Sequence, residues 1–375
     1  MYKFIDLFCG IGAFHQALKN KGQCVFACDI NPECRETYKK NYGIEPFSDI
    51  TKLNINTIPE FDILCAGFPC QSFSNAGKKQ SFSDQRGGMF DYILKIAEKF
   101  KPKYLFLENV KHIIKINNGE VMRYITENLD KIGYDTHTEV LSPHQFGIPQ
   151  NRPRVYFVCC LKESKIVVNI PEIPIVNTFI FEKNTSEKYR IPKEIENVLD
   201  AWNEVINFVD VGESLTPTIM ASEFHTLYTP EEFSELIQWK QDYITKNKRI
   251  YEKYKTNWDL WYNKHKQLLC KNKSYAKLEW QVGIKKENDS IFNYFIQIRQ
   301  SGIRVKKTNY FPTLVAINQT SIYAKEKRYI TPRECARLQS FPEDFNIHEK
   351  DNVAYKQFGN SINVTVLKHV INSVI

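Results

Sequence analysis

The stretch that decides the fold is Lys3-Phe4-Ile5-Asp6-Leu7-Phe8-Cys9-Gly10-Ile11-Gly12-Ala13. Its apolar run predicts a strand, and the helical pattern over 13–20 predicts a helix after the two glycines. Because glycine lacks Cβ, such a turn lets backbone N–H groups approach a ligand. The third glycine of a dinucleotide fingerprint would fall at His15, which argues against NAD, whereas Asp29 follows Gly10 by 19 residues and suits ribose hydroxyls. An adenosine ligand without a pyrophosphate fits these residues, and a structural turn beside a surface acid would explain them as well.

Short apolar runs alternate with helical patterns through the first 160 residues. Further strands are predicted over 24–28, 61–66, 104–108 and 155–160, and further helices over 32–42, 90–100 and 118–131. Asn31 as N-cap and Pro32 at the first helical position mark the start of the second helix. This order predicts an α/β fold, a doubly wound, mostly parallel sheet covered by helices.

The pattern changes to Pro-punctuated, Lys- and Asn-rich sequence past residue 163. We therefore expect a first domain over 1–163, a smaller inserted domain over 164–325 and a segment over 326–375 that returns to the first domain. Within the insert, aromatic residues at three- and four-residue steps over 231–269 predict one long or two shorter helices with a buried aromatic stripe. Residues 231–290 hold 13 Lys and Arg against 9 Asp and Glu, which fits either a solvated helix face or phosphate contacts.

Composition limits the function classes. The 375 residues carry a net charge of +8, from 51 Lys and Arg against 43 Asp and Glu, which suits a polyanionic partner without requiring one. Ten cysteines without any C-x-x-C pair favour reduced thiols and no metal site. The apolar runs are far shorter than the roughly 20 residues that a bilayer requires, and no export signal is visible, so a cytoplasmic protein is expected.

Several polar residues follow the predicted strands and could carry chemistry. Cys70, within Gly67-Phe68-Pro69-Cys70-Gln71, comes directly after a buried strand, and Glu108-Asn109-Val110 ends the next one. Because ligands bind at the carboxyl edge of open α/β sheets, Cys70 and Glu108 should face the same crevice. A thiol there could be a nucleophile, although a lone cysteine is more often inert.

Three more motifs occur later in the chain. Gln150-Asn151-Arg152-Pro153-Arg154 puts two arginines two residues apart, so that both would share one face of an entering strand and clamp an anion or form an exposed basic edge. An N-capped helix is predicted over 331–342, and the run 357–362 precedes another. By pattern alone, the last two are structural.

Taken together and in this order, these motifs resemble those of the cytosine-C5 DNA methyltransferase family, of the bacterial restriction-modification type. The resemblance covers 1–160 and 325–375, and the stretch between corresponds to the family's variable target-recognition domain. Ala13-Phe14, where relatives often carry glycine, is a mild departure that leaves the Gly10/Gly12 turn in place. The resemblance implies a Rossmann-like, S-adenosylmethionine-dependent enzyme that flips a cytosine from duplex DNA and methylates C5 through a covalent Cys70–C6 intermediate.

Site residues follow from the resemblance. It implies that Cys70, Glu108, Arg152 and Arg154 are catalytic, with an arginine favouring the Cys70 thiolate and Glu108 holding the cytosine edge. The S-adenosylmethionine site would comprise Phe8, Gly10, Ile11, Gly12, Asp29, Ile30, Asp49, Ile50, Pro69, Asn360 and Ile362. DNA contacts are expected from Gln71, Ser72, Arg86 and Gln150, and from Arg304, Lys306 and Lys307 in the basic run 301–309, which could equally be an ordinary surface hairpin.

Two alternatives stay open. A tRNA cytosine-C5 methyltransferase would share the nucleophile and acid motifs, although the long insert disfavours it. A catalytically silent DNA-binding protein would keep the fold, although intact Cys70, Glu108 and both arginines argue against it. The Lys-, Asn- and Ile-rich insert hints at an AT-rich bacterial source, and we expect a monomer that acts at the nucleoid and is paired with a restriction endonuclease.

Overall fold

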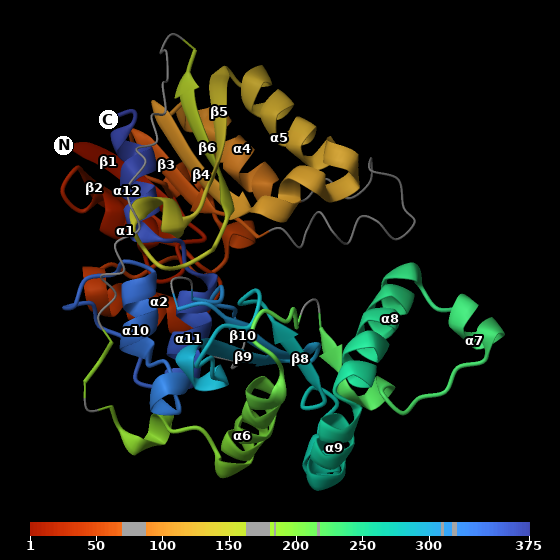
Figure 1. Ribbon diagram of the computed structural model, residues 1–375. Coiled ribbons are helices and arrows are strands. Elements are labelled where there is room, and N and C mark those ends of the chain that lie inside the picture. The colour runs from red at the N-terminus through yellow and green to blue at the C-terminus, as the bar shows by residue number, and fades with distance from the viewer. Residues whose placement is uncertain (70–87, 163–180, 184, 216–217, 309–310, 317–320) are drawn as a thin grey trace. The chain divides into compact units, whose positions relative to one another are not determined.

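The computed structural model describes residues 1–69, 88–162, 181–183, 185–215, 218–308, 311–316 and 321–375, and Figure 1 shows its helices and strands. The chain divides into two compact units. Unit 1 comprises Met1–Phe181, Thr313–Ala316 and Pro332–Ile375, and unit 2 comprises Glu182–Pro312 and Ile317–Thr331.

Unit 1 is built on a six-stranded sheet with the order β2-β1-β3-β4-β6-β5. Its strands are β1 (Tyr2–Leu7), β2 (Gly22–Cys28), β3 (Ile63–Gly67), β4 (Tyr104–Val110), β5 (Tyr134–Leu141) and β6 (Arg154–Leu161). β2, β1, β3 and β4 are parallel neighbours, whereas β6 runs antiparallel to both β4 and β5. The predicted mostly parallel sheet is confirmed, and β5 is an additional edge strand.

Helices cover both faces of this sheet. The α-helices in the described part of unit 1 are α1 (Ala13–Leu18), α2 (Pro32–Tyr42), α4 (Met89–Phe100), α5 (Glu120–Lys131), α10 (Pro332–Leu338), α11 (Asp351–Asn360) and α12 (Val364–Asn372). Figure 1 shows α4 and α5 side by side against the sheet and α1 beside α12 on its other side. α5 begins two residues later than predicted, because Asn117 and Asn118 adopt positive φ angles of 47° and 52°.

The strands of unit 1 bury different side chains on their two faces. Ile5 and Leu7 of β1 belong to one apolar cluster with Leu64, Phe90 of α4 and Ile125 of α5. Because successive residues of a strand point to opposite faces, Asp6 points away from that cluster. The second face therefore places a carboxyl group in the interior of unit 1, where it is fully buried.

Unit 2 has a sheet of its own, with the strand order β12-β11-β9-β10-β8-β7. The strands are β7 (Ile219–Met220), β8 (Lys277–Trp280), β9 (Phe295–Arg299), β10 (Gly302–Lys306), β11 (Ile322–Tyr323) and β12 (Arg328–Tyr329). The helices are α6 (Lys193–Phe208), α7 (Pro230–Ser234), α8 (Gln238–Lys253) and α9 (Lys255–Leu269). The region 231–269, predicted to form one long or two shorter helices, forms two long helices after a short one. Trp258 and Trp261 of the predicted aromatic stripe are buried in the core of unit 2, where they pack with Trp202 of α6. Ile237, an apolar residue of the same region, is exposed.

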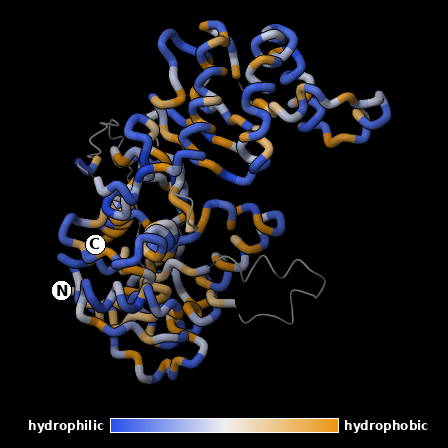
Figure 2. Tube along the Cα trace, turned by 90° about the horizontal axis from the view of Figure 1, so that it is seen from below, coloured by the Kyte–Doolittle hydropathy of each residue, from blue (hydrophilic) through white to orange (hydrophobic). Residues whose placement is uncertain are grey.

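Hydropathy changes every few residues along the described chain, as Figure 2 shows. Such alternation is expected of elements that bury one face and expose the other. Among the helices of the described ranges, none combines the length and apolar character needed to span a bilayer.

Candidate functional site

The loop after β1 is tied to the residue that follows β2. Asp29 Oδ2 accepts a hydrogen bond from the Gly10 N–H at 2.8 Å, and Asp29 Oδ1 accepts one from the Asn31 N–H at 2.8 Å. Burial raises the pKa of Asp29, while the Asn31 and Gly10 N–H groups lower it. Each carboxylate oxygen keeps a further lone pair, and the residue is only half-buried. Asp29 therefore holds the loop and can still accept hydrogen bonds from a ligand.

The two glycines of the loop have different roles. Gly10 has a φ of +53°, and a Cβ built there would meet no atom within 4 Å. Gly12 has a φ of +87°, and its Cβ would lie 2.2 Å from Tyr42 Cε2, so only glycine allows the ring to pack there. The Gly12 N–H donates to the Cys9 carbonyl at 2.8 Å, and the Gly10 N–H is used by Asp29. The loop thus offers open space at Gly10. The N–H groups of Gly10 and Gly12 both donate within the protein, to Asp29 and to the Cys9 carbonyl, respectively.

An exposed apolar side chain lies next to Asp29. Ile30 is 75% exposed, which is unusual for isoleucine. Arg35, in the first turn of α2, donates from Nη1 to the carbonyl oxygens of Asp29 at 2.9 Å and Ile30 at 2.8 Å. Arg35 therefore fixes the backbone that presents both side chains. Arg35 was not predicted from the sequence, because its acceptors are backbone carbonyl groups.

The remaining predicted ligand-binding residues differ in exposure. Asp49 Oδ1 accepts hydrogen bonds from the Thr51 N–H at 3.0 Å and the Thr51 hydroxyl at 2.7 Å, and these bonds lower the pKa of Asp49. Pro69 and Asn360 are exposed, and Phe8 is half-buried with a positive φ of 54°. Ile11, Ile50 and Ile362 are buried.

Glu108 forms an enclosed ion pair with Arg154. In the sheet register Glu108 of β4 lies opposite Gly67 of β3 and Tyr156 of β6. Arg154 Nε lies 3.1 Å from Glu108 Oε1, with side chains 16% and 10% exposed. Burial raises the pKa of Glu108, while the Arg154 and Arg152 cations lower it. A carboxyl group whose pKa burial raises can hold a proton closer to neutral pH, as a general acid requires.

Three motifs that are distant in the sequence meet around Gly67. A Cβ at Gly67 would lie 3.1 Å from Ile362 Cδ1 and 3.7 Å from Glu108 Oε2. Asn109 Nδ2 donates to the Phe68 carbonyl at 2.9 Å, so the end of β4 also holds the backbone that leads to Pro69. The backbone from Gly67 to Pro69 therefore lies beside Glu108 and Asn109, and the convergence of Cys70 with Glu108 stays a prediction.

Arg152 has a different environment from Arg154. It is buried, and its guanidinium donates to the carbonyl oxygens of Leu314 at 2.8 Å, Gly359 at 2.7 Å and Ser361 at 3.0 Å. Burial and the Arg154 cation lower the pKa of Arg152 to about 9, so it stays protonated at neutral pH. Arg152 therefore holds the segment that carries Asn360 and Ile362, whereas Arg154 contacts the Glu108 carboxylate.

The predicted DNA-binding residues are only partly described. Cys70, Gln71, Ser72 and Arg86 lie outside the described residues. Gln150 is fully buried in unit 1. Arg304 Nε pairs with Glu279 Oε2 at 2.6 Å, burial lowers the pKa of Lys306, and Lys307 is exposed. The run 301–308 forms the turn and second strand of the β9–β10 hairpin, which leaves its predicted role in DNA recognition untested.

A buried polar cluster backs the loop after β1. His15 Nδ1 lies 2.8 Å from the Tyr38 hydroxyl, and the His15 ring stacks on Tyr42 with centroids 3.9 Å apart. Burial lowers the pKa of His15 to about 4, so it is neutral at pH 7. Asp6 is fully buried in the same cluster, and burial and Asp29 raise its pKa. The backbone N–H of His15 and the Tyr38 hydroxyl lower the pKa of Asp6. Neither carboxyl oxygen of Asp6 has a hydrogen-bond partner of normal geometry among the described residues.

Comparison with known proteins gives a consistent result. The family model for C-5 cytosine-specific DNA methylase matches residues 2–375. The chain is 30% identical to "Type II methyltransferase M.HhaI" of Haemophilus parahaemolyticus over 98% of this chain and 92% of that protein. It is 31% identical to "Type II methyltransferase M.MspI" of Moraxella sp over 100% of this chain and 70% of that protein.

Solved structures support the fold. The S. pombe Dnmt2 methyltransferase superposes with a TM-score of 0.55 at 20% identity and covers 99% of this chain and 97% of its own. The Entamoeba histolytica methyltransferase EhMeth gives 0.57 at 19% identity and covers 99% and 97% of the two chains. At these identities the likeness concerns the architecture.

Proposed function

The chain belongs to the C-5 cytosine-specific DNA methylase family, a family of enzymes, and we propose that it methylates one cytosine of a short duplex sequence as part of a restriction-modification system. The observation that carries this proposal is the meeting of motifs at Gly67. There the buried Glu108–Arg154 pair, the Phe68–Pro69 backbone that leads to Cys70, and Ile362 lie within a few ångströms of one another. This arrangement suits covalent chemistry on a planar base.

The residues after β1 and β2 suit S-adenosylmethionine. Asp29 has unused acceptor capacity for ribose hydroxyls, Ile30 offers exposed apolar surface for adenine, and Gly10 leaves open space beside them. Arg35 and Arg152 would keep the two flanking backbone segments in place. When bound, S-adenosylmethionine supplies an electrophilic methyl group.

Cys70 and Glu108 would divide the chemistry on the base. Cytosine C5 is a poor nucleophile, so the Cys70 thiolate adds to C6 and forms a C–S bond that makes C5 electron-rich enough to take the methyl group. Glu108 Oε1 is held by Arg154, and Glu108 Oε2 faces Gly67. We assign Oε2 the contact to the cytosine edge, where it shares a proton as charge develops on the ring. Transfer of the C5 proton to solvent then re-forms the C5–C6 double bond, the C6–S bond breaks, and the Cys70 thiolate leaves 5-methylcytosine.

The target cytosine must leave the helix before this chemistry can occur. Extruding a paired base requires a few kcal/mol, which contacts to the flipped base and the backbone repay. Unit 2 would supply the sequence-specific contacts, since it overlaps most of the stretch 164–325 that was predicted to be the target-recognition domain. We also propose that the protein is a monomer and that it is paired with a cognate restriction endonuclease.

Transfer of a labelled methyl group from S-adenosylmethionine tests the function. We expect the wild type to label duplex DNA and to leave tRNA unlabelled, and Cys70→Ala to label neither. Labelling of tRNA alone would replace the proposed substrate with RNA. Absence of labelling from a folded protein that binds DNA would favour a silent DNA-binding protein.

A further inference from the structure

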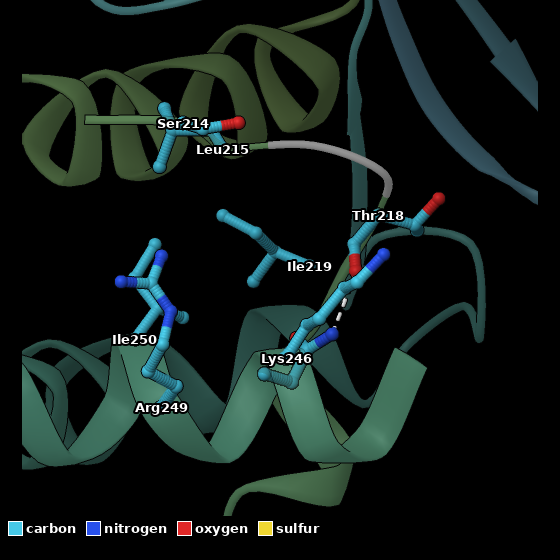
Figure 3. A pocket seen from close by; sticks show the side chains of 8 residues that line it. Ser214, Leu215, Thr218, Ile219, Lys246, Arg249 and Ile250 are labelled. Carbon is cyan, nitrogen blue, oxygen red and sulfur yellow. Dashed lines mark hydrogen bonds between the residues drawn. The ribbon is translucent and has the colours of Figure 1, made fainter. Parts of the chain in front are cut away.

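A pocket of about 280 Å³ lies in unit 2 between α8 and the residues 214–215 and 218–219 (Figure 3). Leu215, Ile219 and Ile250 line it with apolar side chains that are buried. Lys246 and Arg249 extend from α8 on the side of the pocket, as Figure 3 shows. The pocket therefore combines an apolar lining with two cationic side chains at its mouth.

Asn247 fixes the geometry of this pocket. Asn247 Nδ2 donates to the Thr218 carbonyl at 2.7 Å, and Asn247 Oδ1 accepts from the Met220 N–H at 2.8 Å. Asn247 is 3% exposed, so both bonds are shielded from water. These bonds tie α8 to Thr218 and to Met220 of β7 at one side of the pocket.

Positive charge exceeds negative charge around the pocket mouth. Arg249 Nη2 lies 2.9 Å from Glu213 Oε1, and Lys253 Nζ lies 2.7 Å from Glu213 Oε2 and 3.1 Å from Asp210 Oδ2. Lys246 forms no ion pair with any residue in the described part of the chain. Arg249 uses one of its five N–H donors on Glu213. Lys246 and the remaining Arg249 donors can therefore bind an anion.

We propose that this pocket binds one phosphate of the DNA backbone, which rests on the proposed function in taking duplex DNA as the substrate. Lys246 and Arg249 lie three residues apart on one face of α8 and can donate to the same phosphate oxygens. The apolar lining accommodates the C–H surface of the adjoining deoxyribose. Such a contact carries no sequence information, but it fixes the register of unit 2 on the duplex.

The helix offers a matched control for the test. Lys248, like Lys246, is an exposed lysine of α8, but it does not line the pocket. We would measure the Kd of Lys246→Ala, Lys248→Ala and the wild type for a short duplex over a range of salt concentrations. Loss of one phosphate contact lowers the slope of log K against log salt by about 0.9. We expect this change and a several-fold weaker Kd for Lys246→Ala, wild-type behaviour for Lys248→Ala, and a restored slope for Lys246→Arg.

The outcomes separate the two proposals. If the wild type binds and methylates duplex DNA but Lys246→Ala behaves like Lys248→Ala, the pocket assignment is overturned and the proposed function stands. If inorganic phosphate weakens DNA binding no more than chloride of equal ionic strength, the site prefers the backbone to the free ion, as we expect. If inorganic phosphate protects the wild type against unfolding and the salt slopes are identical, the pocket is a free-anion site. If the wild type neither binds nor methylates DNA, both proposals fail.

Discussion

Replacing Arg152 with alanine should destabilise unit 1, because this guanidinium is a structural tie. The substitution leaves three carbonyl oxygens, those of Leu314, Gly359 and Ser361, without their donor. Hydrogen bonds to charged groups contribute about 1.5–3 kcal/mol each, and the guanidinium no longer has to be desolvated, which offsets part of the loss. We expect the free energy of unfolding to fall by about 3–5 kcal/mol.

Arg154→Ala is the matched comparison. It removes the counterion of Glu108, whose carboxyl group can then take up a proton, so the buried charge need not persist. Since the Arg154 cation lowers the pKa of Glu108, its removal should raise that pKa further. The free energy of unfolding should therefore fall by less than for Arg152→Ala, and the main effect should be on methyl transfer.

The assay must report on unit 1. All five tryptophans lie between Trp202 and Trp280, within unit 2, so tryptophan fluorescence would miss the effect. Far-ultraviolet circular dichroism in urea reports on both units, and hydrogen exchange of the peptide 357–363 reports on the segment that Arg152 holds. If Arg152→Ala loses less than about 1 kcal/mol, or if Arg154→Ala destabilises the protein equally, the structural role of Arg152 is refuted.

Three further predictions concern the residues around the loop after β1. Asp29→Ala should weaken S-adenosylmethionine binding by about 1–2 kcal/mol in calorimetry, and unchanged affinity would contradict the assignment. Arg35→Met should raise the KM for S-adenosylmethionine several-fold and leave kcat nearly unchanged, since it releases two carbonyl groups that position Asp29 and Ile30; an equal loss in kcat would show a wider role. His15 has a pKa of about 4 in the folded protein against about 6.5 when unfolded, so the unfolded state binds the proton more readily and stability is lost as the pH falls from 6.5 to 4. In urea titrations at several pH values, His15→Gln should reduce this pH-dependent loss of the free energy of unfolding by about 3 kcal/mol. The same pH dependence in the wild type and in His15→Gln would refute a buried neutral imidazole.

Much of unit 1 could be predicted because its sequence is locally consistent. Apolar runs of strand length that alternate with helical patterns predicted the parallel order, and residues after successive parallel strands must share one sheet edge. β5 was missed because Tyr134-Asp135-Thr136-His137-Thr138-Glu139 mixes polar and apolar residues at a sheet edge. In unit 2, strands of two to five residues are too short to leave a periodic signal.

The surroundings of Arg152 and Arg154 could be predicted only in part from the sequence. They were expected to share one face of a strand, but β6 begins at Arg154, so Arg152 precedes the strand and does not follow its alternation. The partners of Arg152 lie at 314 and 359–361, and nothing in a local pattern indicates contacts over such separations. Arg35 was missed for a related reason, since its acceptors are backbone carbonyls that carry no residue-specific signal.

The central claim is that this chain methylates cytosine in DNA through Cys70. We would express the wild type and Cys70→Ala in a bacterial host that lacks DNA methylation and map 5-methylcytosine at single-base resolution by chemical-conversion sequencing. We expect the wild type to methylate one short sequence motif and Cys70→Ala to methylate none. Methylation by both proteins would contradict the assignment of the nucleophile, and unmodified DNA from a folded wild type that binds S-adenosylmethionine would contradict the proposed substrate.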